Sequence, residues 1–234
     1  AQQLGIQPED MVVISVMPCI AKKYEALRPE HRTSGARDVD YVITTRELAK
    51  MLKEAGIDLR DMDDEEFDNP LGESTGAGVI FGAGGGVLEA ALRTAYEEVT
   101  GSELGDVNFT AVRGLAGVKE ATIDLNGRRL NVAAASGLGN ARVILDNIER
   151  GTSKYDVIEI MACPGGCING GGQPYSEERV ETIELRMKAL YQIDGEKAVR
   201  KSHENPSIIR LYKEFLGEPG SHKAHALLHT DYWY

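Results

Sequence analysis

The most constraining feature of the sequence is a short segment in which two cysteines lie among glycines and prolines. Cys163 and Cys167 are separated by Pro-Gly-Gly, and residues 170–174 read Gly-Gly-Gly-Gln-Pro. Glycine allows positive φ angles and close backbone approach, but its ordering costs entropy that a loop without a ligand has little reason to bear. Thiolates are the ligands that iron–sulfur clusters use. The segment therefore favours a loop that wraps around a bulky, soft cofactor.

The third cysteine, Cys19, also follows a strand-like segment. Residues 11–16 form a continuous apolar run of strand length, and residues 155–160, before Cys163, are predicted to form a short buried strand. Sites in α/β sheets collect at the carboxyl ends of strands, so we expect the cysteines at these two ends to bind one cluster. A 4Fe–4S cluster takes four thiolates, which leaves one ligand to come from outside this chain.

Charge and composition argue against several classes of function. The net charge of −11 over 234 residues disfavours nucleic acid or an anionic membrane as the main partner. No apolar run approaches the roughly 18 residues of a membrane-spanning helix. Three cysteines with a single close pair indicate a metal role in a reducing compartment. A cytoplasmic location is expected, and a periplasmic one stays open because the true N-terminus is expected to be missing.

The pattern of elements predicts an α/β fold, with parallel-sheet lobes, flanking helices, a β-hairpin and then a helical C-terminal wrap. Asn126-Gly127 is the preferred two-residue type I′ turn and places the hairpin over 118–125 and 128–135. Thr45 is the expected N-cap of a helix over 46–55. The expected domains are 1–174 and 175–234. The other expected strands are 11–16, 40–43, 108–112 and 155–160, and the other expected helices are 20–27, 87–99, 138–149, 177–192, 206–215 and 223–229.

Two further patterns have alternative interpretations. The glycine-rich run 76–86 precedes a helix and suggests a phosphate loop, but it lacks the G-x-x-x-x-G-K-[ST] pattern, so packing of the helix against the cluster is favoured. His222, His225 and His229 lie at near-helical spacing. They would suit a zinc site, although surface or capping histidines are commoner near a C-terminus.

These motifs resemble those of the FeFe-hydrogenases. Residues 17–25 resemble the second signature of that family, M-P-C-x-x-K-x-x-E, and residues 159–174 resemble its third, E-x-M-A-C-x-G-G-C-x-x-G-G-G-Q-P. The family's first signature, T-S-C-C-P-x-W, is absent. The resemblance therefore implies the C-terminal part of the catalytic domain. Residues 44–49 and 76–93 also match that family. So do residues 202–206 and 227–230, which lie in a tail similar to the family's small-subunit region.

The resemblance implies reversible oxidation of H2 to protons and electrons at an H-cluster. This cofactor is a 4Fe–4S cube linked through a cysteine to a di-iron unit with carbonyl, cyanide and dithiolate ligands. Cys19 and Cys163 would be cube ligands, and Cys167 would bridge the cube to the di-iron unit. Lys22 would donate a hydrogen bond to a cyanide, and Glu25, three residues later, could hold it in place. Residues lining the di-iron pocket would be Met17, Pro18, Phe81 and Met161. For the two methionines and Phe81, plain core packing is the rival interpretation, and the two are not exclusive.

The implied partners are the N-terminal part of the same enzyme or a separate subunit carrying the missing signature, a ferredoxin-like electron carrier, and maturation proteins. Two rival functions remain open. A Nar-type cytosolic iron–sulfur assembly protein has similar cysteine motifs but no di-iron unit. A zinc-stabilised domain would use Cys19, Cys163, Cys167 and one histidine.

Overall fold

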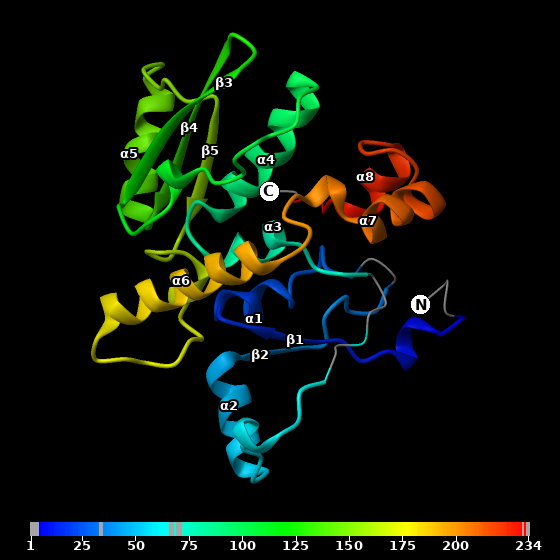
Figure 1. The fold of residues 1–234 in the computed structure, drawn as a ribbon. Coiled ribbons are helices and arrows are strands. Elements are labelled where there is room, and N and C mark those ends of the chain that lie inside the picture. Colours follow the sequence, from blue (N-terminus) through cyan, green and yellow to red (C-terminus); the bar gives the residue numbers. More distant parts are fainter. Residues whose placement is uncertain (1–4, 33–34, 66–67, 69–71, 231, 233–234) are drawn as a thin grey trace. The chain divides into compact units, whose positions relative to one another are not determined.

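A computed structural model describes residues 5–32, 35–65, 68, 72–230 and 232 (Figure 1). Contacts divide the chain into two compact units. Unit 1 comprises residues 1–68, 170–175 and 212–234, and unit 2 comprises residues 69–169 and 176–211. Unit 1 is therefore assembled from three separate segments of the chain. The expected boundary between residues 174 and 175 stays a prediction.

Unit 1 is built on a small parallel sheet. Strand β1 (Ile14–Met17) pairs in parallel with β2 (Tyr41–Thr44), and Ile14 lies opposite Tyr41. The Val13 N–H donates to Asp40 Oδ2 at 2.8 Å, which joins the approaches to the two strands. The helical elements of this unit are α1 (Ala21–Glu25), α2 (Thr45–Glu54), α8 (His222–Leu228), a π-helix at Tyr212–Leu216, and 3₁₀ turns at Pro8–Asp10 and Leu59–Asp61.

Helix α2 begins with a capping box one residue earlier than expected. Thr44 Oγ1 accepts from the Glu47 N–H at 3.2 Å, and Glu47 Oε2 accepts from the Thr44 N–H at 2.7 Å. The capping box needs an acidic or amide side chain three residues after the cap, and Glu47 stands in that relation to Thr44. The prediction of Thr45 as N-cap was therefore wrong by one residue.

Unit 2 is a three-stranded sheet with helices packed against it (Figure 1). β3 (Val118–Leu125) is antiparallel to β4 (Arg128–Ser136), and β4 is parallel to β5 (Val157–Met161). Alternate residues of β4 face opposite sides of the sheet. Val132 and Ala134 pack with residues of α4 (Gly86–Thr100), whereas Ala133 and Ala135 pack with a residue of α5 (Leu138–Glu149). Burial on both faces explains why residues 132–135 of this strand, Val-Ala-Ala-Ala, are all apolar.

The hairpin prediction is confirmed, and one strand prediction is wrong. Asn126 has φ 55° and Gly127 has φ 88°, as the type I′ turn requires. Residues 108–112, expected to be a strand, instead include a 3₁₀ turn at Thr110–Val112. The Asn108 backbone N–H and side-chain amide both donate to Asp106 Oδ1, and this local turn competes with strand pairing.

The C-terminal part is helical in all the regular structure that the described residues show. In unit 2 it contains α6 (Arg179–Glu196), a 3₁₀ turn at Ser202–Glu204 and α7 (Pro206–Leu211). Earlier in the same unit are α3 (Gly76–Val79) and 3₁₀ turns at Ile80–Gly82 and Cys167–Asn169. The predicted mixed α/β class is confirmed. Among the described residues, no helix has both the length and the apolar character needed to cross a membrane.

Candidate iron–sulfur site

The loop that carries Cys163 and Cys167 follows the carboxyl end of β5 in unit 2. The Gly166 N–H donates to the Cys163 carbonyl at 3.0 Å and closes a turn between the two thiols. Gly165 and Gly166 have φ 82° and 94°, a conformation that disfavours residues with a Cβ. Cys163 is half-buried and Cys167 is exposed. The turn thus presents two thiols on a backbone with few side chains.

The glycine-rich segment before α4 packs directly on this cysteine loop. The Gly84 N–H donates to the Gly165 carbonyl at 3.0 Å. A Cβ on Gly166 would lie 2.5 Å from the Gly84 nitrogen, and a Cβ on Gly84 would lie 2.7 Å from Ser136 Oγ. The two loops therefore meet backbone to backbone, and this close approach explains why both are rich in glycine.

Cys19 lies in unit 1, where it also follows a strand. β1 ends at Met17, and Pro18 and Cys19, both half-buried, lead towards α1. The Gly172 N–H donates to the Pro18 carbonyl at 2.8 Å, and the Arg46 N–H donates to the Gly172 carbonyl at 3.1 Å. A Cβ on Gly172 would approach Thr44 to 2.9 Å. The glycine segment that follows Cys167 in sequence thus lies against the Cys19 loop within unit 1.

Three of the predicted site residues line one cavity in unit 1. Met17, Lys22 and Glu25 border a cavity of about 220 Å³, together with His31. Lys22 and Glu25 form an ion pair, in agreement with their three-residue spacing. Both are partly exposed, so the pair by itself contributes little stability. The pair places the Glu25 carboxylate directly beside the Lys22 ammonium at the border of this cavity.

The remaining predicted residues lie in unit 2. Met161 is half-buried and ends β5, two residues before Cys163. Phe81 is 47% exposed, in the 3₁₀ turn that precedes the glycine segment. An exposed aromatic side chain is not a core residue, so the plain-core interpretation does not describe Phe81 in this structure.

The donor set fits an iron–sulfur cofactor. None of the chain's three cysteines, all of them described, forms a disulfide. Cys163 and Cys167 lie on a glycine-rich turn, and the Cys19 loop packs against Gly172, so glycine backbone near each loop would let inorganic sulfide approach closely. Thiolate sulfur is the ligand type that selects iron–sulfur clusters, zinc and copper(I) over hard cations. The residues present therefore fit the cluster that the motifs predict.

Two residues of this region were missed by sequence reasoning. Lys119 lies in the hairpin but is only 5% exposed, and its burial lowers the pKa of its ammonium, against the opposing effect of Glu159. Glu159 begins the third signature, yet no role was predicted for it. Glu159 lies within an otherwise apolar strand, Val-Ile-Glu-Ile-Met, and a glutamate in such a strand is an unusual signal, because a carboxylate shielded from water needs hydrogen-bond partners.

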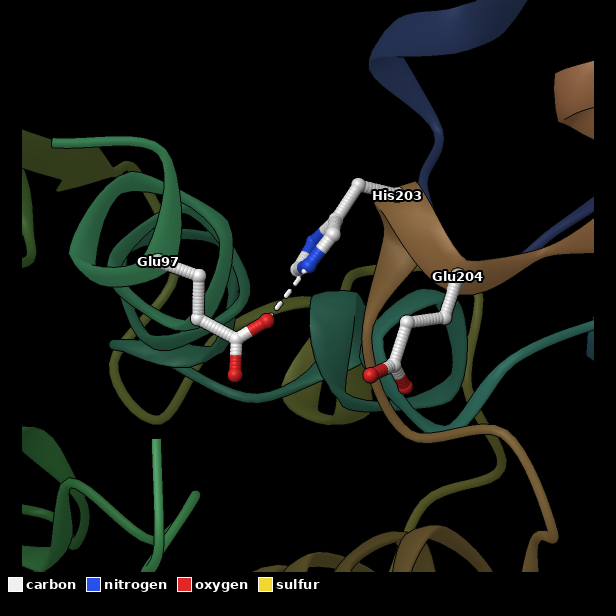
Figure 2. A group of neighbouring side chains, drawn as sticks. All are labelled: Glu97, His203 and Glu204. Atoms are coloured by element: carbon white, nitrogen blue, oxygen red, sulfur yellow. Dashed lines mark hydrogen bonds and ion pairs between the residues drawn. The ribbon is translucent and has the colours of Figure 1, made fainter. Parts of the chain in front are cut away.

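A second group of potential metal ligands lies away from the cysteines. Ligand atoms of Glu97, His203 and Glu204 lie within 4.8 Å of one another (Figure 2). His203 Nε2 is 2.7 Å from Glu97 Oε2. However, Lys201 Nζ donates to Glu97 Oε1 and to Glu204 Oε1, at 2.7 Å each. The lysine ammonium already supplies the positive charge, so the group is an ionic cluster that joins α4 to the Ser202–Glu204 turn. Among the described residues, His222, His225 and His229 form no such group.

This ionic cluster makes stability depend on pH. The Leu104 N–H, followed by Lys201 and His203, lowers the pKa of Glu97 to about 2. A lowered carboxyl pKa adds stability above the unfolded value of about 4.5, and this stability is lost as the pH falls towards 2. We expect Glu97→Gln to lower the melting temperature most above pH 5, with the difference from wild type shrinking steadily below pH 4. Thermal unfolding at a series of pH values measures this, and a constant difference down to pH 2 would contradict it.

Comparisons with known proteins identify the class. Residues 1–171 match the iron-only hydrogenase large subunit, C-terminal domain, and residues 180–233 match the iron hydrogenase small subunit. The chain belongs to the iron-only hydrogenase family. It is 55% identical over 233 residues to the NADP-reducing hydrogenase subunit HndD of Solidesulfovibrio fructosivorans. It is 44% identical over 232 residues to iron hydrogenase 1 of Clostridium pasteurianum.

The chain is also similar to solved structures of hydrogenases and to a second class of protein, the cytosolic iron–sulfur cluster assembly factors. A variant of the FeFe-hydrogenase HydA1 from Chlamydomonas reinhardtii matches 99% of this chain with a TM-score of 0.82 and 44% identity, over 65% of that chain. The cytosolic Fe-S cluster assembly factor narfl of Danio rerio is 32% identical over 99% of this chain and 57% of its own length. The matches to the two hydrogenase relatives cover 100% and 97% of this chain, respectively. They cover only 40% of the length of each relative.

Proposed function

We propose that this chain is the C-terminal part of an FeFe-hydrogenase catalytic domain and helps to hold an H-cluster. The whole enzyme would reversibly oxidise H2 to protons and electrons. The observation that carries the proposal is the pair of cysteine loops, each placed after a strand and each packed against glycine backbone. Higher identity to hydrogenases than to assembly factors supports the same choice.

In this proposal the cysteines have different roles. Cys19 and Cys163 ligate the 4Fe–4S cube, and Cys167 links the cube to the di-iron unit. A cube takes four thiolates, whereas the sequence contains three cysteines, so a further ligand comes from a residue outside this sequence. The carrier would be the N-terminal part of the same enzyme or a separate subunit. When bound, the cofactor supplies the redox chemistry and the site at which H2 is split.

The surrounding side chains would orient the cofactor and exclude water. The Lys22 ammonium donates to an anionic cyanide ligand, and Glu25 keeps that ammonium in position through the ion pair. Met17, Pro18, Phe81 and Met161 provide soft or apolar surface around the di-iron unit. Because Phe81 is exposed, its ring is accessible for contact with a bound group. These assignments leave proton transfer to groups outside this chain.

We expect Lys22→Met to lower hydrogen turnover by about 10- to 100-fold, as is typical when a residue that orients a metal ligand is lost. Methionine keeps the length of the side chain but removes the donor. The infrared bands of cyanide should shift while the unfolding temperature changes little, because the lysine is exposed on one side. Lys50→Met is the control, since Lys50 forms an exposed ion pair on α2. Unchanged cyanide bands would contradict the role of Lys22.

Infrared spectroscopy of the full-length, matured protein tests the proposed function. Bands of metal-bound carbonyl and cyanide are expected for a hydrogenase. Their absence from protein that contains a 4Fe–4S cluster would favour the Nar-type assembly function, and zinc in place of iron would favour the zinc-stabilised domain. The proposal for the hydrogenase also includes its partners and location. The electron partner would be a ferredoxin-like carrier, maturation proteins would deliver the di-iron unit, and the enzyme would be cytoplasmic.

A further inference from the structure

A lysine and a glutamate lie side by side on one face of the sheet in unit 2. Lys119 of β3 is opposite Ala134 of β4, and Ala134 is opposite Glu159 of β5. Residues in register across a sheet point to the same face, so the two charged side chains flank the alanine. The methyl group of Ala134 leaves room above it. The face on which they stand is the one that packs on α4.

The two side chains hold opposite ends of one peptide group. Lys119 Nζ donates to the Gly84 carbonyl at 2.6 Å, and Glu159 Oε1 accepts from the Gly85 N–H at 2.6 Å. The Gly84 carbonyl and the Gly85 N–H belong to the same peptide bond. Lys119 also donates to the Gly114 carbonyl at 3.1 Å, and Glu159 Oε2 accepts from the Leu88 N–H at 2.7 Å. Charge-assisted hydrogen bonds of this kind are roughly twice as strong as neutral ones.

The peptide held in this way is next to the one that supports the cysteine loop. The Gly84 N–H belongs to the preceding peptide group, and it donates to the carbonyl of Gly165, which lies between Cys163 and Cys167. Gly85 has φ 93°, and a Cβ there would lie 1.9 Å from the Val112 carbonyl oxygen. The glycine segment is therefore packed directly against the Val112 backbone as well as being held by the two side chains of the sheet. Its position sets that of the Gly165 carbonyl, and so of the turn that presents the two thiols.

We propose that Lys119 and Glu159 are positioning residues that clamp the Gly84–Gly85 peptide, fix the Cys163–Cys167 turn, and bias the reduction potential of the bound cluster in opposite directions. This inference rests on the proposed function, because it requires a cluster at these cysteines. It assigns a role to the glutamate that begins the third signature and to a lysine outside all the motifs. Neither residue touches the cofactor in this proposal.

The sign of each effect follows from charge. Reduction adds an electron to the cluster, so a buried cation nearby favours the reduced state and a buried anion disfavours it. Lys119→Met should lower the reduction potential of the 4Fe–4S cube, and Glu159→Gln should raise it. The double variant removes both charges and should return the potential towards the wild-type value. Simple loosening of the fold would instead shift both single variants in the same direction.

The experiment uses the full-length holoenzyme with its cube loaded. The potential is measured by redox titration followed by electron paramagnetic resonance, for wild type, both single variants and the double variant. The matched control is an exposed pair in the same unit, Lys154 and Glu120, which are 3.0 Å apart. Lys154→Met and Glu120→Gln remove the same charges where solvent screens them, so they should leave the potential unchanged.

Hydrogen exchange on the same proteins provides a second measurement. In Glu159→Gln the side chain keeps one acceptor in place of two, so the amides of Gly85 and Leu88 should exchange about tenfold faster or more. Opposite shifts that cancel in the double variant, with this faster exchange, support the inference. Equal potentials, or shifts of one sign, overturn it. A wild-type protein that binds no cluster at all overturns the proposed function instead, and the exchange result still shows whether the clamp exists.

Discussion

Replacing Cys167 by alanine in the complete enzyme is expected to lower hydrogen turnover by about a thousandfold or more, equivalent to over about 4 kcal/mol of activation free energy. In the proposed function this thiolate alone joins the cube to the di-iron unit, and no other cysteine in the turn can replace it. Cys167 is exposed at the start of a 3₁₀ turn, so its removal creates no core cavity. Stability should therefore change by less than about 0.5 kcal/mol.

Hydrogen-evolution assays, infrared spectra and thermal unfolding together test this result. Carbonyl and cyanide bands should be lost with the activity, while the cofactor-free variant should unfold at nearly the same temperature as the cofactor-free wild type. Thr152→Ala is a suitable control, because Thr152 is an exposed loop residue before β5 whose hydroxyl makes a single hydrogen bond, to the Asn147 carbonyl. Retention of both the bands and the activity in Cys167→Ala would remove the bridging role from this residue.

The second large effect is expected at Arg93, which is fully buried in unit 2. Its guanidinium donates to both carboxyl oxygens of Asp194, at 2.7 and 2.8 Å, and to Glu89 Oε1 at 2.8 Å. The backbone carbonyls of Val107 and Arg200 accept its remaining bonds at 2.9 Å each. Arg93 therefore ties α4 to α6 and to two loops through a single side chain.

Arg93→Met should lower the free energy of unfolding by about 3–5 kcal/mol, because it leaves two carboxylates buried beside fewer cations. The melting temperature should fall by roughly 10 °C for a chain of this size. Arg113 and Arg200 still contact Glu89 and Asp194, which moderates the loss. Arg142→Met is the control, since its pair with Asp146 is exposed and its loss should cost under about 0.5 kcal/mol. Equal melting temperatures for the two variants would contradict the assigned role.

Local signals in the sequence were enough to predict most elements and the cysteine loops. The Asn126-Gly127 turn predicted the hairpin, and the helix expected over 87–99 is α4, which Gly101 ends with φ 65°. Residues 108–112 were mistaken for a strand because their apolar and β-branched side chains outweigh the turn-forming Asp106 in a propensity argument. That preference was overridden by hydrogen bonds from Asn108 to Asp106.

The site was predictable only where its residues are close in sequence. The Lys22–Glu25 pair follows from helical spacing, and the cysteines stand out beside their glycines. Lys119 gave no such signal, because a lysine in a hairpin is usually solvent-exposed. Its burial depends on the Gly84 carbonyl, 35 residues earlier in the chain. Long-range partners of this kind are set by the tertiary fold and leave no local periodicity.

The interrupted course of unit 1 has a consequence for how the protein is made. This unit draws on residues 1–68, 170–175 and 212–234, so the surroundings of Cys19 need partners far along the chain. Contacts of long sequence separation form slowly, and a chain emerges from the ribosome N-terminus first. The neighbourhood of Cys19 can therefore be completed only after residue 172, whose N–H binds the Pro18 carbonyl, has been synthesised. If a cluster were delivered to Cys19 before that point, the residues that pack around this thiol would not yet be folded.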